Sequence, residues 1–200
     1  MKLLAGYLDH SAQETLLSEI REIVRQAPLF TPCMPRTGKP FSVRMSNCGP
    51  LGWVADKQGY RYQSTHPITD EPWPNIPDQL LKLWSDLTDF GGEPEACLIN
   101  HYEPRAKMGL HVDEDEEEFM APIFSLSLGD DARFRLGGMN RKDPTKSFIL
   151  HSGDVLLLDG EDRKAYHGID RIYAGTSTLL KAPGRINLTM RRVTSWNETE

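Results

Sequence analysis

The chain has 200 residues and a mass of 22.7 kDa, which fits one domain with some elaboration. Its composition, 38% hydrophobic and 26% charged, excludes gross disorder and collagen-like or coiled-coil architectures. A net charge of −6 argues against non-specific coating of nucleic acid, although it allows a local basic groove.

The cysteine count and the first residues of the chain indicate the cellular compartment. Three cysteines are an odd number without metal-type spacing, so we expect reduced thiols. The short N-terminal apolar run does not resemble a signal peptide, and no run approaches the roughly 18 apolar residues of a membrane span. We therefore expect a cytoplasmic protein that does not enter a membrane.

Two amphipathic helices are predicted in the first half of the chain. The first covers about 12–26, with Ser11 as N-cap and Glu14 completing a capping box. The second covers about 78–90 and begins after Pro77, a residue that suits a first helical turn. We interpret the apolar stripe of each helix as a packing surface.

Short strands dominate the rest of the chain. Segments 42–45 and 53–62 are predicted to be extended, and from residue 96 onward eight runs rich in branched and aromatic residues alternate with turn signals. These eight runs are 97–102, 108–111, 123–128, 133–136, 147–150, 155–158, 166–169 and 185–192. Helices followed by many short strands predict an α+β protein with a sandwich or jelly roll.

A histidine and an aspartate, His111 and Asp113, stand two residues apart. On an extended chain they share a face, so both side chains can reach one metal ion. His151 and His167 are the candidates for a third ligand, and two imidazoles with one carboxylate form the site of non-haem Fe(II) oxygenases. The alternative is a polar strand end whose side chains are satisfied by neighbours or water.

The last predicted strand carries two arginines on one face. Arg185, Asn187, Thr189 and Arg191 have one parity, while the opposite face is apolar over three positions. Guanidinium groups bind carboxylates through paired hydrogen bonds, so this face suits an acid with a carboxylate at each end. The alternative is a solvated edge strand. Fe(II), O₂ and a two-carboxylate 2-oxo acid together are what a 2-oxoglutarate-dependent dioxygenase requires.

Six segments resemble one known family. They are NCGPLGW at 47–53, QGYRY at 58–62, CLINHY at 97–102, HVDED at 111–115, YHGI at 166–169 and RINLTMR at 185–191. The sequence resembles the AlkB family of Fe(II)- and 2-oxoglutarate-dependent nucleic-acid dealkylases over about 42–192. The resemblance implies a double-stranded β-helix (jelly-roll) core at 96–200. Residues 1–95 would then supply helices and a nucleotide-recognition lid, within one structural domain.

The resemblance also implies which residues hold the metal and the cosubstrate. His111, Asp113 and His167 would bind Fe(II), which leaves His151 as a surface residue next to a turn. Arg185 would pair with the distal carboxylate of 2-oxoglutarate, and Arg191 would lie near the carboxylate that chelates the iron. The other residues expected to reach the cosubstrate are Asn100, Tyr102, Asn187 and Thr189.

The lid implied by the resemblance would bind the damaged base. Trp53 would stack on a flipped base that has His111 on its other side, and Met45 would line the pocket. Tyr60 and Tyr62 would contact backbone phosphates. The alternative for the aromatic residues is simple core packing.

Two further residues, Asp115 and Arg141, match positions that touch the base and the substrate in the family. Asp115 opens an acidic run at 115–118 that is more acidic than is usual in the family. Since charge runs usually form a solvated face, we interpret this run as exposed.

The expected activity is oxidative demethylation of N1-methyladenine and N3-methylcytosine, which releases succinate, CO₂ and an aldehyde. The expected partner is alkylated DNA, single- or double-stranded, with RNA as a further substrate, and the expected state is a monomer. Two alternatives stay open: a 2-oxoglutarate-dependent hydroxylase of a protein or small molecule, and a non-enzymatic jelly-roll binding module. The first needs no stacking lid, and the second has no use for the two-arginine strand.

Overall fold

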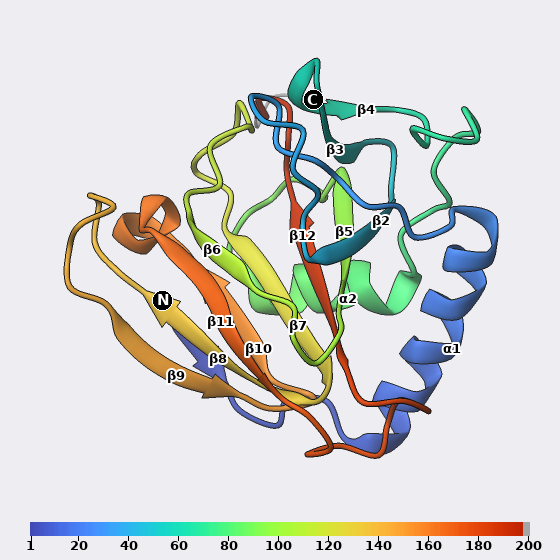
Figure 1. Ribbon diagram of the computed structural model, residues 1–200, viewed down its shortest axis with the longest axis vertical. Helices are drawn as coiled ribbons and strands as arrows, with labels where there is room; N and C mark the ends of the chain where they lie inside the picture. Colours follow the sequence, from blue (N-terminus) through green and yellow to red (C-terminus); the bar gives the residue numbers. More distant parts are fainter. Residues whose placement is uncertain (198–200) are drawn as a thin grey trace.

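Two antiparallel sheets form the core of the protein in a computed structural model that describes residues 1–197 (Figure 1). The larger sheet has six strands, which follow one another in the order β1 (Lys2–Leu4), β10 (Val155–Leu158), β7 (Ile123–Gly129), β12 (Arg185–Arg191), β5 (Ala96–Tyr102) and β2 (Val43–Cys48). The smaller sheet has the order β6 (Met108–His111), β11 (His167–Tyr173), β8 (Asp131–Leu136) and β9 (Lys146–Leu150). This arrangement confirms the predicted α+β jelly roll.

A hydrophobic cluster joins the inner faces of the two sheets. Phe134 of β8 and Ile169 of β11 belong to the same buried cluster as Leu98 of β5 and Leu156 of β10. In the larger sheet, β12 lies between β7 and β5, so its polar residues are held in the middle of that sheet. Period-two alternation therefore sends one side of β12 toward the space between the sheets and the other side toward the helices.

Two helices, α1 (His10–Gln26) and α2 (Asp78–Leu87), cover the outer face of the larger sheet (Figure 1). Their apolar stripes pack with the alternate residues of the central strands, such as Ile99 and Leu188. This placement confirms that the stripes are packing surfaces. Burial of a Leu or Ile side chain stabilises a fold by roughly 1.5–3 kcal/mol, so this layer contributes much of the stability.

The helix boundaries differ slightly from the prediction. The N-cap of α1 is Asp9 and not Ser11, because the Asp9 carboxylate accepts a hydrogen bond of 2.8 Å from the backbone N–H of Ala12. An Asp side chain caps as well as a Ser side chain, so both were eligible by type. The second helix ends at Leu87 because Thr88 is extended.

The segment before residue 95 contributes to the core as well as covering it. β1 and β2 are strands of the six-stranded sheet, and β1 is too short for its alternation to be visible in the sequence. The predicted extended segment 53–62 forms a hairpin of β3 (Gly52–Asp56) and β4 (Gly59–Gln63). A short 3₁₀ helix, η1 (Gly160–Lys164), was not predicted. Among residues 1–197, no helix is long and apolar enough to cross a membrane.

Candidate metal and cosubstrate site

Three side chains that can bind a metal meet where β6 and β11 pair. His111 ends β6, His167 begins β11, and the two residues are register partners. Nε2 of His111 lies 3.5 Å from Oδ1 of Asp113, and Nε2 of His167 lies 3.5 Å from Oδ2. Gly168 allows the two strands to approach, because a Cβ atom there would lie 2.6 Å from the carbonyl oxygen of Met108. One ligand atom from each of the three side chains lies within 4.8 Å of the other two.

Backbone carbonyl groups orient the two imidazole rings. Nδ1 of His111 lies 2.9 Å from the carbonyl oxygen of Gly109, and Nδ1 of His167 lies 3.0 Å from that of Ala165. A carbonyl oxygen only accepts, so the hydrogen is placed on Nδ1 and the lone pair on Nε2. Both lone pairs are then directed toward Asp113, as a shared metal requires.

The charge states also suit a cation. Burial, with His167 nearby, lowers the pKa of His111 to about 4, so its imidazole is neutral at neutral pH. Burial alone would raise the pKa of Asp113, but Arg191 and the two imidazoles hold it well below its usual range. The site therefore offers two imidazole nitrogens and one carboxylate, the donor set of non-haem Fe(II) oxygenases.

Arg185 lies in the larger sheet with its charge buried. Only 1% of the residue is exposed, and Nη2 donates to the hydroxyl of Ser127 at 2.8 Å. Nε and Nη1 have no partner among the described residues. Burial lowers the pKa of this guanidinium to about 10, so it stays charged at neutral pH. A buried cation with unused N–H donors is costly unless a ligand pairs with it, and a carboxylate can accept from one planar edge of a guanidinium.

Neutral polar side chains lie beside Arg185 on the same face. Asn100 donates from Nδ2 to the hydroxyl of Thr189 at 3.4 Å, and its Oδ1 has no partner in the described part of the chain. Thr189 in turn donates to Oδ1 of Asn187 at 2.9 Å. Burial raises the pKa of Tyr102, the register partner of Arg185, to about 12, so its phenol is neutral. The face thus keeps an unused donor pair and an unused acceptor for a polar ligand.

Arg191 connects this face to the metal ligands. Its Nη2 lies 2.8 Å from Oδ1 of Asp113, and its Nη1 lies 2.6 Å from Oε1 of Glu116. Arg163 of η1 donates to the other carboxylate oxygen of Glu116 at 3.2 Å. Glu116 is only 4% exposed, so the interpretation of the whole acidic run as a solvated face is wrong at this position. Both arginines lie far from Glu116 in the sequence, so no local sequence pattern predicted these ion pairs.

Most of the chain resembles known oxygenases. A family model described as the 2OG-Fe(II) oxygenase superfamily matches residues 1–191. The chain belongs to this superfamily. It is 51% identical over 187 residues to the alpha-ketoglutarate-dependent dioxygenase AlkB homolog of Caulobacter vibrioides, covering 94% of this chain and 84% of that protein. It is 42% identical to the alpha-ketoglutarate-dependent dioxygenase AlkB of Escherichia coli, covering 91% of this chain and 85% of that protein. A solved structure, OsALKBH1, has a TM-score of 0.80 at 29% identity and covers 95% of each chain.

The residues of this oxygenase fit the groups that the superfamily uses, which are Fe(II), 2-oxoglutarate and O₂. His111, Asp113 and His167 can hold Fe(II) and leave positions open. The unused donors of Arg185 match a carboxylate of 2-oxoglutarate. The recognised family is therefore supported by two independent features, a donor set and a buried cation without a partner.

The structure places the expected substrate residues of the oxygenase at different depths. Trp53 is 9% exposed, and its indole N–H donates at 2.8 Å to Oδ2 of Asp115, two residues along the chain from the ligand Asp113. Tyr60 stacks on Trp53 with ring centroids 5.6 Å apart and is 44% exposed. Met45 is buried in the cluster that contains Trp53. Arg141 is exposed between β8 and β9.

Tyr62 does not lie where a phosphate contact needs it. Its hydroxyl donates to Glu116 and accepts a hydrogen bond of 3.1 Å from Nη1 of Arg191. Burial raises the pKa of Tyr62 well above its usual range. These hydrogen bonds hold the phenol inside the protein. In the β3–β4 hairpin, Tyr62 is the register partner of Trp53. The expected phosphate contact therefore does not fit this conformation.

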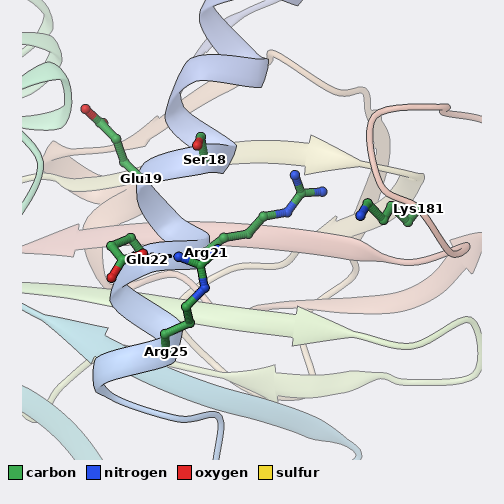
Figure 2. A pocket seen from close by; sticks show the side chains of 6 residues that line it. All are labelled: Ser18, Glu19, Arg21, Glu22, Arg25 and Lys181. Carbon is green, nitrogen blue, oxygen red and sulfur yellow. Dashed lines mark hydrogen bonds and ion pairs between the residues drawn. The ribbon is translucent and has the colours of Figure 1, made fainter.

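Two features lie outside the site. His151 is exposed and lies 3.0 Å from Asp131, which confirms it as a surface residue. Figure 2 shows a hollow on the outer face of α1, where Arg21 extends toward the loop of Lys181 and Glu22 pairs with Arg25. The hollow has both signs of charge and contains none of the metal ligands. We assign no ligand to it.

Proposed function

We propose that this oxygenase removes alkyl groups from nucleobases in DNA, and also in RNA, with N1-methyladenine and N3-methylcytosine as substrates. The two AlkB dioxygenases, similar over most of their length, support this activity. The observation that carries it is the hydrogen bond between Trp53 and Asp115, which holds an aromatic ring two residues from the ligand Asp113. A lesion on the pairing edge favours such substrates, since a base that cannot pair is less costly to flip.

The chain supplies positions and charges for the reaction. When bound, Fe(II) with 2-oxoglutarate and O₂ supplies the oxidation: one oxygen atom goes to succinate with loss of CO₂, and the other goes to the alkyl carbon, which leaves as an aldehyde. We assign the metal to His111, Asp113 and His167. Arg185 would hold the distal carboxylate of 2-oxoglutarate, and Arg191 would lie near the other carboxylate. Asn100, Tyr102, Asn187 and Thr189 would complete the polar lining.

The base would bind against the β3–β4 hairpin. Tyr60 covers one face of the Trp53 indole, so a base has to use the opposite face. Stacking of this kind contributes roughly 1–3 kcal/mol per base. Because Trp53 is nearly buried, the hairpin has to shift when the base enters. Asp115 uses Oδ2 for the indole, and we assign its Oδ1 to an exocyclic amino group.

The remaining contacts would be made by exposed groups. The Tyr60 hydroxyl and the Arg141 guanidinium are available to backbone phosphates, and Met45 would line the base pocket from β2. We propose a monomer that acts in the cytoplasm, since the three cysteines Cys33, Cys48 and Cys97 are free thiols and suit a reducing compartment.

Succinate formation tests the proposal. The purified protein with Fe(II) and 2-oxoglutarate is given a methylated oligonucleotide, the same oligonucleotide without methyl groups, the free methylated nucleoside, or a peptide. We expect succinate and aldehyde in equal amounts with the methylated oligonucleotide. Turnover with the peptide or free nucleoside alone would refute the proposal and favour a protein or small-molecule hydroxylase. No turnover with any substrate would favour a binding module.

A further inference from the structure

Glu116 lies at the centre of a buried network that surrounds Asp113. One of its carboxylate oxygens accepts from Arg191 at 2.6 Å and also from the Tyr62 hydroxyl. The other accepts from Nη2 of Arg163 at 3.2 Å. None of the Glu116 side chain is exposed, so water cannot replace these partners.

Both arginines also bind Asp113, from opposite ends of that residue. Arg191 donates to its carboxylate Oδ1 at 2.8 Å, while Arg163 donates from Nη1 to its backbone carbonyl oxygen at 2.7 Å. Arg163 is anchored further by a 3.0 Å hydrogen bond from Nε to the carbonyl oxygen of Ala121. Asp113 is therefore held at side chain and main chain by two groups that share Glu116.

The charges of the network balance. Asp113 and Glu116 carry two negative charges, and Arg163 and Arg191 carry two positive charges, all in buried residues. Without Glu116 the network would have a net positive charge beside the metal ligands. Arg191 would then have only the Asp113 carboxylate as an anionic partner and would compete for it with a bound cation.

We propose that Glu116 is a positioning residue that presents the Asp113 carboxylate to the metal by engaging Arg191 and Arg163. This inference rests on the metal site of the proposed function and is independent of the nucleic-acid substrate. Neighbours of metal ligands orient the ligands and tune their basicity, and their loss commonly costs 10–100-fold in metal affinity. Glu116, three residues after Asp113, thus acts through its charge and length, although it is not one of the metal ligands.

The test is a titration of the metal-free protein with Co(II) alone, read by calorimetry and by the visible absorption of the bound ion. Glu116→Gln removes the charge and turns an amide N–H₂ toward one guanidinium. We expect its Co(II) affinity to fall by about 10–100-fold and the absorption bands to change in position or intensity. The matched control is Glu117→Gln, the same change at the exposed neighbouring position, which should leave affinity and spectrum unchanged.

A second variant covers the case in which Glu116→Gln does not fold. Glu116→Asp keeps the charge but is too short to reach both arginines, so we expect a folded protein with a smaller loss of Co(II) affinity and an intermediate spectrum. Wild-type affinity and spectrum in a folded Glu116→Gln would overturn the proposal, even with a lower Tm, because the role would then be structural only. If Glu116→Gln is unfolded, wild-type binding by Glu116→Asp would overturn it. These readouts need no oligonucleotide, so they stand or fall separately from the demethylase assay.

Discussion

Replacement of Arg185 by lysine should selectively weaken the binding of 2-oxoglutarate. Arg185 is buried, its Nη2 is engaged by Ser127, and its Nε and Nη1 have no partner among the described residues. Ser127 occupies one N–H of Nη2, so one planar edge of the guanidinium, made by Nη2 with either Nε or Nη1, stays free for the two oxygens of a carboxylate. Lysine keeps the positive charge but offers a compact ammonium in place of the planar edge.

The expected loss follows from the number of hydrogen bonds. A hydrogen bond to a charged group contributes roughly 1.5–3 kcal/mol, and lysine retains at most one of the two. At about 1.4 kcal/mol per factor of ten, losing one such bond weakens 2-oxoglutarate by about ten- to a hundredfold. Because Arg185 lies on the inner face of the sheet and the base site lies at the hairpin, binding of a methylated oligonucleotide should change much less.

Calorimetric titration of the Zn(II)-loaded protein with 2-oxoglutarate measures this effect without turnover. Arg133→Lys is the matched control, because Arg133 makes a partly exposed ion pair with Asp170 at 2.7 Å on the smaller sheet. Such pairs contribute little, so the control should bind 2-oxoglutarate like the wild type. Unchanged affinity in Arg185→Lys, or an equal loss in Arg133→Lys, would refute the role assigned to Arg185.

Three more outcomes are expected. His167→Ala should abolish succinate formation in a folded protein, whereas His151→Ala should not; the reverse result would make His151 the third ligand. Removal of the metal by a chelator should likewise abolish activity, and added Fe(II) should restore it. Trp53→Ala should lower the Tm, because the indole is buried, and should also raise the KM for a methylated oligonucleotide by about ten- to a hundredfold; a lower Tm with unchanged KM would make it a packing residue only. Burial and Arg44 lower the pKa of His101 below 6.5 in the folded protein. As the pH falls through 6.5, the unfolded chain therefore binds more protons than the folded chain, and the free energy of unfolding decreases. His101→Gln should therefore lose less unfolding free energy than the wild type between neutral pH and about pH 5, as measured by urea denaturation, and an equal loss would contradict this.

The amino-acid sequence determined the features that depend on local periodicity. Alternation along 185–191 placed Arg185 and Arg191 on one face, and the spacing of His111 and Asp113 placed two ligands together. The alternation along β12 holds in the structure because the period of a β-strand is set by the backbone, whatever the strand pairs with, whereas Asp113 lies two residues beyond the end of β6. The family and its jelly-roll core were expected from the resemblance of the segments around these residues, and not from periodicity.

Strand register and packing decided the rest. Spacing alone left His151 and His167 open as third ligand, and the pairing of β11 with β6 brings His167 opposite His111. Glu116 belongs to a run that reads as a solvated surface, yet it is buried by arginines 47 and 75 positions away in the chain. The local sequence determines on which face of a strand a side chain lies. The charged groups that contact the side chain on that face come from distant segments, which only the folded chain brings together.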